Sequence, residues 1–361
     1  MGSAPLQVFA GARAREHLRQ AGLRAEDVWA VPGAAGGPKG LVLNALDRQL
    51  FGHWLPQAQR TVHLLGASIG AWRLAAACLP DAPAALARLA ADYIGERYGV
   101  APGTAPSAQR VSRVFGRTLA AHFDAAACAA VLAHPQFRLH VFTSRGRRLL
   151  AAPGRWRTPL GYAAAFASNA WARPALGGWL QRVVFSDPRS PLPLVLDAEL
   201  GGTTAALTRV NLVPAVQASC SIPFAMEPVL DVPGGPPGAY WDGGLTDYHL
   251  HLDYAAAAAD GIVLYPHFQP RVVPGWLDKP FGGRHRASAR LDNVVVLAPH
   301  PDWIARLPGG KLPDRSDFQR YRADPAAREG VWRRALAESE RLAEAFDALT
   351  RLSSVAALPL P

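Results

Sequence analysis

The chain has 361 residues, of which 50% are hydrophobic and 18% are charged, and its formal net charge is +10 at pH 7. These proportions are typical of a globular protein with a large buried core and exclude a mainly disordered chain. Arginine supplies almost all of the positive charge. Such a balance favours anionic partners, namely nucleic acid, anionic lipid or acidic substrates, although a solvated arginine-rich surface explains it equally well.

The sequence also predicts where the protein is located and whether its cysteines bind metal. The first 22 residues carry charges where a signal peptide would be apolar, and no uninterrupted apolar run reaches the roughly 18 residues of a membrane span. We therefore expect a soluble cytoplasmic protein. The three cysteines, Cys78, Cys128 and Cys220, lack CxxC spacing, so we expect buried free thiols and no metal site. We also expect no cofactor.

The first part of the chain predicts alternating strands and helices. Residues 8–21 have the spacing of a short amphipathic helix, and residues 27–31 form an apolar strand that runs into a Gly/Ala/Pro loop at 33–38. Helical spacing returns from Lys39, and residues 62–78 repeat the order of strand, small-residue loop and helix. Two consecutive units of this kind predict an α/β core whose parallel strands bring both loops to one edge of the sheet.

The remaining residues continue this mixed pattern. Apolar periodicity predicts helices over 84–98, 111–132, 159–173, 211–219 and 326–352, and strands over 139–143, 182–185, 238–241, 262–265 and 293–297. Residues 269–292 are rich in Pro, Gly and Arg and are the best candidate for a mobile loop or linker.

A serine elbow, Gly66-Ala67-Ser68-Ile69-Gly70, lies between the second strand and its helix. Small residues on both sides of Ser68 let the backbone turn sharply, so that the hydroxyl stands at the end of the strand as a nucleophile would. The N–H of Ile69 then lies at a helix N-terminus, where it can stabilise a developing oxyanion.

The preceding loop, residues 33–40, gathers small residues at the corresponding place. Such a loop suits either a phosphate cradle or an oxyanion hole. The Walker and Rossmann spacings are both broken, which favours the oxyanion hole. Pro38 has no N–H, so the expected donors are Gly36 and Gly37, with Lys39 as a further candidate.

A third segment, Asp242-Gly243-Gly244, follows an apolar strand end. Two glycines after an aspartate leave its carboxylate free to turn into a cleft, although the same pattern fits an ordinary Asp-Gly turn.

In this order and spacing, the three segments resemble the patatin-like phospholipases, serine acyl hydrolases that use a Ser-Asp dyad without a histidine. The glycine-rich loop of that family matches residues 36–40, its elbow residues 66–70 and its Asp-Gly-Gly/Ala motif residues 242–244. Residues 218–224, Ala-Ser-Cys-Ser-Ile-Pro-Phe, are similar to the segment that precedes the catalytic aspartate in the family. One position departs from the family pattern, because Ala35 stands where the first of three glycines is usual.

The resemblance implies a three-layer α/β fold with helices on both faces of the sheet, and a lipid acyl hydrolase that forms a covalent acyl-serine. Ser68 would attack the ester carbonyl and Asp242 would accept its proton. An aspartate is a weak base at its ordinary pKa of about 3.9, so burial in an apolar pocket is expected to raise the pKa. The oxyanion would be bound by the N–H groups of Gly36, Gly37 and Ile69. The supporting positions of the loops would be Lys39, Gly40, Gly66, Gly70, Gly243 and Gly244.

Three other functions stay open at this point. A Ser-Asp-His triad of the α/β-hydrolase kind would take its base from the histidines after Asp242, namely His249, His251, His267 or His300. A second alternative is a non-catalytic protein of this fold that binds lipid or polymer granules. The third alternative is a nucleotide-binding enzyme, which ranks last because the Walker and Rossmann phosphate-binding patterns are both broken.

Domain organisation and partners follow from the same reading. We expect a catalytic domain over 1–270, with its motif-bearing core at 27–250, and a loop plus helical extension over 271–361 packed on it. The partners expected are a lipid or acyl-ester substrate and no nucleic acid. The arginine-rich segment 145–157 is a candidate for peripheral contact with an anionic membrane surface, or a basic surface loop.

Overall fold

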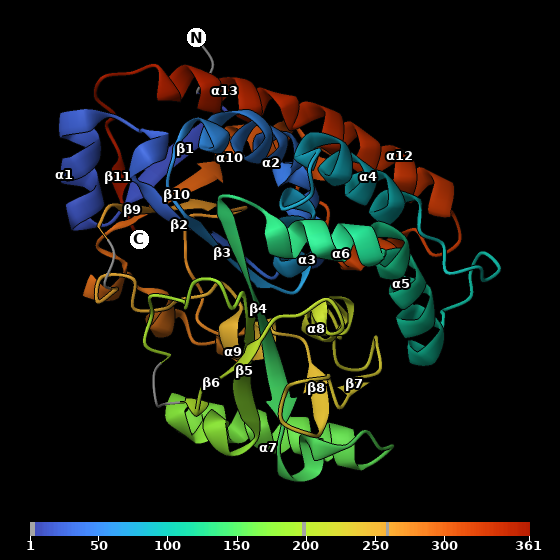
Figure 1. Cartoon of the computed structure of the whole chain (residues 1–361). Helices are drawn as coiled ribbons and strands as arrows, with labels where there is room; N and C mark the ends of the chain where they lie inside the picture. The colour runs from blue at the N-terminus through green and yellow to red at the C-terminus, as the bar shows by residue number, and fades with distance from the viewer. Residues whose placement is uncertain (1–3, 197–199, 258–259) are drawn as a thin grey trace.

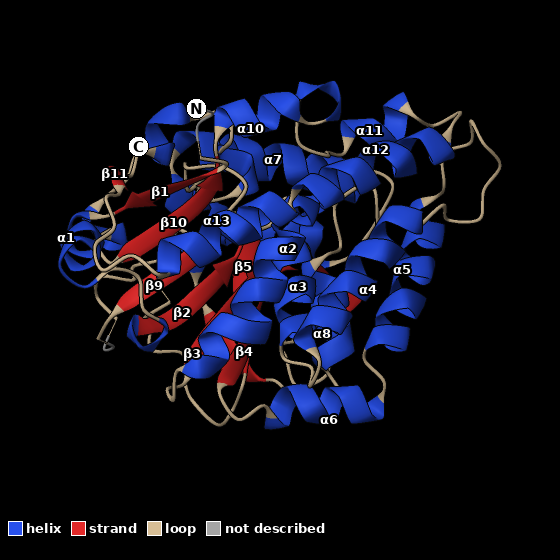
Figure 2. Cartoon of the chain, turned by 90° about the horizontal axis from the view of Figure 1, so that it is seen from above, coloured by secondary structure: helices blue, strands red, loops and turns tan. Residues whose placement is uncertain are grey.

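A central sheet flanked by helices organises the chain (Figures 1 and 2). The computed structural model describes residues 4–196, 200–257 and 260–361. The strands are β1 Leu6–Ala10, β2 Val28–Gly33, β3 Val62–Ala67, β4 Phe137–Gly146, β5 Leu180–Ser186, β6 Thr203–Ala206, β7 Val229–Leu230, β8 Ala239–Trp241, β9 Ile262–Pro266, β10 Val294–Pro299 and β11 Leu358–Pro359. The α-helices are α1 Ala12–Ala21, α2 Asn44–Gln49, α3 Ile69–Ala77, α4 Ala82–Gly95, α5 Ala108–His122, α6 Ala125–Ala133, α7 Arg157–Trp171, α8 Leu212–Ser219, α9 Gly244–Asp247, α10 Pro301–Arg306, α11 Ser316–Arg320, α12 Pro325–Glu338 and α13 Glu340–Thr350.

The strand order across the sheet is β11-β1-β10-β9-β2-β3-β4-β5-β6. The neighbours from β10 to β4 are parallel, whereas β1 and β5 run antiparallel to β10 and β4. β8 pairs with the far end of β4 and with β7. All six residues of both β2 and β3 are buried, as expected for parallel strands covered on both faces. The predicted α/β class with parallel central strands is thus confirmed.

Helices close over the sheet on the side of the elbow. α3 packs on β2 and β3, α2 packs on α3's neighbour α4, and α13 packs on α2. In Figure 1, α12 and α13 cross the top of the molecule and α7 lies at the opposite end. A second, smaller core lies beneath α7 and contains Leu150, Tyr162, Trp241 and Leu245. Within the described ranges, no helix is both long and apolar enough to cross a membrane.

Most predicted elements are confirmed to within a few residues, but three boundaries were wrong. The predicted helix over 8–21 begins only at Ala12, because residues 6–10 form β1 and pair with β10. The predicted helix 111–132 is split by Asp124, whose carboxylate accepts from the N–H of Ala127 and starts a new helix. The long C-terminal helix is likewise two helices, which meet at Ser339.

The stretch after residue 270 is tied to the rest of the chain by a strand. β10 lies between β1 and β9, and α12 and α13 pack against the region of α2 and α4. The predicted loop at 269–292 contains short 3-10 turns, including η8 (Trp276–Asp278) and η9 (Gly282–His285). The division of the chain at residue 270 stays a prediction.

Candidate active site

The two small-residue loops meet at one edge of the sheet. β2 and β3 are parallel neighbours, and Gly33 pairs with Gly66 at their carboxyl ends. The chain therefore leaves both strands at the same level, and the loop 33–40 lies beside the elbow as predicted. Gly70, in the first turn of α3, faces this junction, and a Cβ on it would lie 1.9 Å from the carbonyl oxygen of Gly33. Only a glycine permits this approach of helix to strand.

Ser68 forms the turn between β3 and α3. Its backbone has φ 55° and ψ −129°, a conformation that L residues adopt only under constraint, and its side chain is buried. The N–H groups of the first two residues of α3, Ile69 and Gly70, have no intrahelical acceptor, as is usual at the start of a helix.

Asp242 meets this serine across the sheet. The Ser68 hydroxyl donates a 2.6 Å hydrogen bond to Oδ2 of Asp242, and the Gly244 N–H donates to Oδ1 at 2.7 Å. Burial raises the pKa of the Asp242 carboxyl, and the Arg315 guanidinium and the Ser68 hydroxyl offset this only in part. A carboxylate in this position, with a raised pKa, is suited to accept a proton from the hydroxyl.

A second serine holds the elbow in place. The Ser219 hydroxyl, fully buried at the end of α8, accepts the N–H of Ser68 at 2.8 Å and donates to the carbonyl of Phe142 at 2.6 Å. The backbone N–H of Gly243 donates to the carbonyl of Ser219. The sequence singled out residues 218–224 as a motif but did not reveal the role of Ser219 within it.

The predicted oxyanion loop begins a 3-10 turn, η2 (Gly37–Leu43). Gly37 has φ 57°, which favours glycine, and it lines the same cavity as Ser68 and Ile69. A Cβ on Gly36 would lie 2.5 Å from the ring of Phe268. Ala35 is buried with its N–H bonded to the carbonyl of Tyr248, and positive φ is not required of it, so an alanine fits where the family usually has glycine.

The supporting positions lie where backbones and side chains crowd together. A Cβ on Gly243 would lie 2.0 Å from the carbonyl oxygen of Phe142, and one on Gly244 would lie 2.6 Å from the Cβ of Ala35. The same test gives contacts of 2.4 Å at Gly66 and 3.3 Å at Gly40. Every glycine predicted to support the site therefore packs closely against a neighbour.

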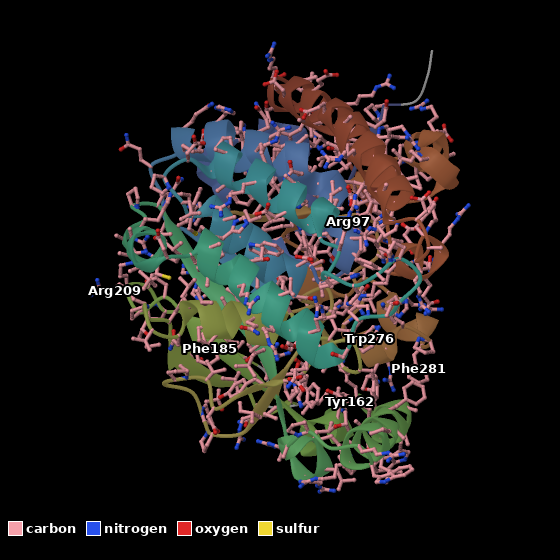
Figure 3. The ribbon with its side chains drawn as sticks, turned by 90° about the vertical axis from the view of Figure 1, so that its right-hand side faces the viewer. Arg97, Tyr162, Phe185, Arg209, Trp276 and Phe281 are labelled. Atoms are coloured by element: carbon pink, nitrogen blue, oxygen red, sulfur yellow. The ribbon has the colours of Figure 1, made fainter. Side chains whose placement is uncertain are left out.

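A cavity of about 340 Å³ opens at Ser68. Its volume lies in the range of about 300–1,000 Å³ that is usual for small-molecule sites. Most of its wall is apolar and comes from α3 to α5, the segment after α8, and α11. The lining includes Trp72, Tyr93, Val111, Phe115, Ile222, Met226 and Phe318, with Arg97 and Arg315 at its polar side. In Figure 3, Arg97 is labelled on the face toward the viewer.

Three cations, Lys39, Lys279 and Arg315, lie around the candidate site, and Arg315 also lines the cavity. The Lys39 ammonium lies 5.3 Å from the ring centroid of Phe268, and that of Lys279 lies 4.0 Å over Tyr248. Arg315 lies against Gly37, where a Cβ would be 3.3 Å from its Nε. Burial lowers the pKa of Lys279 to about 8, and the positive charges of Arg315 and Lys39 lower it in the same direction. Sequence reasoning found Lys39 but missed Lys279 and Arg315, which no local motif marks.

The four candidate histidines make their hydrogen bonds and ring contacts with groups other than the Ser68 hydroxyl and the Asp242 carboxylate. Nδ1 of His249 accepts the N–H of Val273, and its ring lies 4.3 Å from that of His267, to which it is perpendicular. Burial lowers the pKa of both rings, that of His267 to about 3. His251 is half-buried, and partial burial lowers the pKa of its ring, while His300 caps α10 by accepting the N–H of Asp302. The hydrogen bonds of the Ser68 hydroxyl and the Asp242 carboxylate go to each other and to Gly244.

The comparisons with known proteins agree with this geometry. No curated protein matches the chain. A family model described as patatin-like phospholipase matches residues 35–250, which is more than half of the chain and includes the elbow, Ser219 and Asp242. The chain belongs to the patatin-like phospholipase family.

Proposed function

We propose that the protein hydrolyses carboxylic esters of lipids through a covalent acyl-Ser68 intermediate. Membership of the family implies lipid acyl hydrolase activity. The observation that carries the detailed mechanism is the 2.6 Å hydrogen bond from the Ser68 hydroxyl to the buried carboxylate of Asp242. It joins a nucleophile to a base whose pKa burial has raised.

The reaction takes two steps. Ser68 Oγ attacks the ester carbonyl carbon while Asp242 takes its proton, and the resulting tetrahedral intermediate expels an alkoxide, which receives that proton. Water then attacks the acyl-serine, giving its proton to Asp242, and the serine leaves with the proton as the fatty acid is released. The N–H groups of Gly36, Gly37 and Ile69 would bind the oxyanion in both steps.

The apolar lining of the cavity beside Ser68 favours an acyl chain as its ligand. Its apolar wall would remove the chain from water, with a gain of about 0.8 kcal/mol for each buried CH₂. Val111 lines the cavity on α5. A Val111→Trp substitution is expected to shift the preference toward shorter acyl chains, measured as kcat/KM over a series of p-nitrophenyl esters.

The cations support an anionic leaving group. The charges of Arg315 and Lys279 act on the Asp242 carboxyl, and Lys39 follows Gly37 by two residues and interacts electrostatically with Arg315 and Lys279. A phosphate attached to the alcohol of the ester would meet them when the acyl chain fills the cavity. We therefore favour phospholipids or lysophospholipids over neutral glycerides as substrates.

Labelling with a fluorophosphonate probe tests the mechanism. The wild type is expected to be labelled at Ser68 and to hydrolyse a p-nitrophenyl acyl ester, whereas Ser68→Ala loses both and Asp242→Asn loses at least about 10³-fold in rate. Ser288→Ala, which removes an exposed serine, is the matched control and keeps the label. A folded wild type that takes no label would point instead to a non-catalytic lipid-binding protein.

Substitution of the histidines separates the dyad from a triad. His249→Asn and His267→Asn are expected to keep rates within about tenfold of the wild type when thermal unfolding shows that they are folded. A loss of several orders of magnitude in a folded variant would assign the base to that histidine.

A further inference from the structure

A long stretch around α7 carries only one sign of charge. Between Asp124 and Asp187 the chain has no acidic residue but has eight arginines. Three of those in the predicted basic segment hold nearby structure. Arg145 donates to the carbonyl of Pro237, Arg147 to that of Gly177, and Arg148 lies over the ring of Trp179. Arg155 and Arg157 are exposed, one on each side of Trp156.

The solvent face of α7 is apolar. Its inner face, with Tyr162, Ala165 and Asn169, is buried. On the outer side, Trp156 is 70% exposed, Leu160 59% and Trp171 86%. The other exposed positions of the helix after Leu160 are alanines and Phe166. A helix with this pattern, apolar toward water and bordered by arginines, has the composition of a helix that lies in a membrane interface.

α7 is also connected to the candidate active site. On its inner face, the ring of Tyr162 lies 5.5 Å from that of Trp241, the residue before Asp242, and 5.6 Å from that of Phe224. Phe224 is itself 62% exposed and follows the cavity residue Ile222. Figure 3 shows Tyr162 above α7 on the same side of the molecule as Arg97, which lines the cavity.

A second segment extends the surface. Phe281 stacks on Phe166 at 5.9 Å, and the Arg284 guanidinium lies 4.6 Å from the ring centroid of Phe281. Arg286 follows and is exposed. Arg284 is paired with the buried Asp278 at 2.7 Å, so the positive charge that borders the apolar face comes from Arg155 and Arg157 at the start of α7 and from Arg286 after η9.

We propose that the solvent face of α7, with Trp156, Leu160 and Trp171 inserted among the lipids, docks on an anionic bilayer surface. The bordering arginines contact the lipid phosphates while the apolar side chains enter the interface. A second copy of the chain fits less well, because a symmetric contact through this face would bring arginines of both copies together. Docking would place the molecule with α7 toward the membrane and α12 and α13 away from it (Figure 1).

This inference rests on the proposed function for its purpose, since docking brings the enzyme to its substrate, but docking itself needs no catalysis. The test therefore uses the Ser68→Ala protein, so that vesicle binding is measured whether or not the wild type hydrolyses lipid. Co-sedimentation is measured with vesicles of phosphatidylcholine alone and with vesicles that also contain about 30% phosphatidylglycerol, whose negative surface potential attracts arginines. Low and high salt are compared, because salt screens the contribution of the arginines.

Two sets of variants divide the apolar from the charged contribution. Combining Trp156→Ser, Leu160→Ser and Trp171→Ser is expected to weaken binding at least about tenfold at both salt concentrations. Arg155→Gln with Arg157→Gln is expected to weaken binding to anionic vesicles about 30-fold at low salt, with little change on phosphatidylcholine. Val210→Ser is the matched control, because Val210 is 73% exposed and its neighbour Arg209 lies at the far edge from Phe281 in Figure 3.

The triple variant changes only exposed side chains, and its thermal unfolding midpoint is expected to stay within a few degrees of the parent. The proposal is overturned if the parent does not bind anionic vesicles, or if the folded triple variant binds as tightly as the Val210→Ser control. It is also overturned if the parent is a dimer in light scattering that the triple variant converts into a monomer, because the face would then be an interface between copies.

Discussion

The hydroxyl of Ser219 accepts a 2.8 Å hydrogen bond from the backbone N–H of Ser68, the proposed nucleophile, and so holds the elbow in place. The same hydroxyl donates to the carbonyl of Phe142 in β4, so one side chain joins the elbow, α8 and the sheet. The N–H of Ser68 is thereby satisfied within the fold, and the hydroxyl of Ser68 is left to face Asp242. One buried hydroxyl thus contributes to holding the unusual backbone conformation of Ser68.

Replacing Ser219 by alanine is expected to lower both stability and activity. It leaves a buried N–H and a buried carbonyl without their partner, which costs about 1–3 kcal/mol in the free energy of unfolding. Urea denaturation measures the loss, and fluorophosphonate labelling measures the reactivity of Ser68, which should fall.

Ser186→Ala is the matched control for Ser219→Ala. Ser186 is also buried, but its hydroxyl has no hydrogen-bond partner among the residues that the structure describes. Its removal is expected to change the free energy of unfolding by less than about 0.5 kcal/mol. Equal losses in the two variants would argue against the role assigned to Ser219.

Gly70 is expected to tolerate no larger residue. Alanine has the higher helix propensity, yet its Cβ would lie 1.9 Å from the carbonyl oxygen of Gly33. Gly70→Ala should therefore destabilise the fold by about 3 kcal/mol or more, or prevent it from forming. Gly95→Ala, at the end of α4 where a Cβ meets nothing within 4 Å, should be neutral or slightly stabilising. Thermal unfolding of both proteins decides the matter, and similar midpoints would contradict the packing argument.

Local pattern sufficed for the elements whose signals lie within a few residues. β2, β3 and the turns that follow them could be predicted because apolar runs and small residues are read without knowing their partners. β1 could not, since the residues that make it a strand are those of β10, almost 300 positions away in the chain. The breaks at Asp124 and Ser339 were missed because apolar periodicity continues across them.

The same distinction holds for the site. Ser68, Gly37 and Asp242 stand in motifs, whereas Arg315 reaches Gly37 only because the chain returns through α11. Nothing near residue 315 in the sequence marks it as a neighbour of the elbow. Contacts of this kind depend on the tertiary fold, so they become visible only when the elements are placed.

The buried pair Arg73–Asp47 is expected to stabilise α3 only as a pair. Arg73, five residues after the nucleophile, makes two hydrogen bonds of 2.7 Å to Asp47, and both side chains are almost completely buried. Asp47→Leu would leave an unpaired buried guanidinium and cost about 3–5 kcal/mol, whereas Asp47→Leu with Arg73→Met should recover most of that loss. A double-mutant cycle in urea measures the coupling. Additive losses would show that the two side chains act independently.

The charge of Arg315 is expected to set where activity is lost at low pH. In the proposed mechanism Asp242 must be deprotonated to act as base, so kcat/KM is expected to fall as the pH drops through the pKa of its carboxyl. Burial raises this pKa, and the guanidinium of Arg315 is the largest influence that lowers it. Arg315→Gln removes that influence, so the pKa rises further and the acid limb of the profile moves to higher pH.

The acid limb is measured as kcat/KM for a neutral p-nitrophenyl ester from about pH 4 to about pH 8, a range that covers the titration of a carboxyl whose pKa is above its ordinary value. Arg320→Gln removes another exposed arginine, at the end of α11 that Arg315 precedes, and should leave the limb in place. A plain loss of rate in Arg315→Gln without a shift of the limb would mean that Arg315 acts by shaping the cavity and not through the charge state of Asp242.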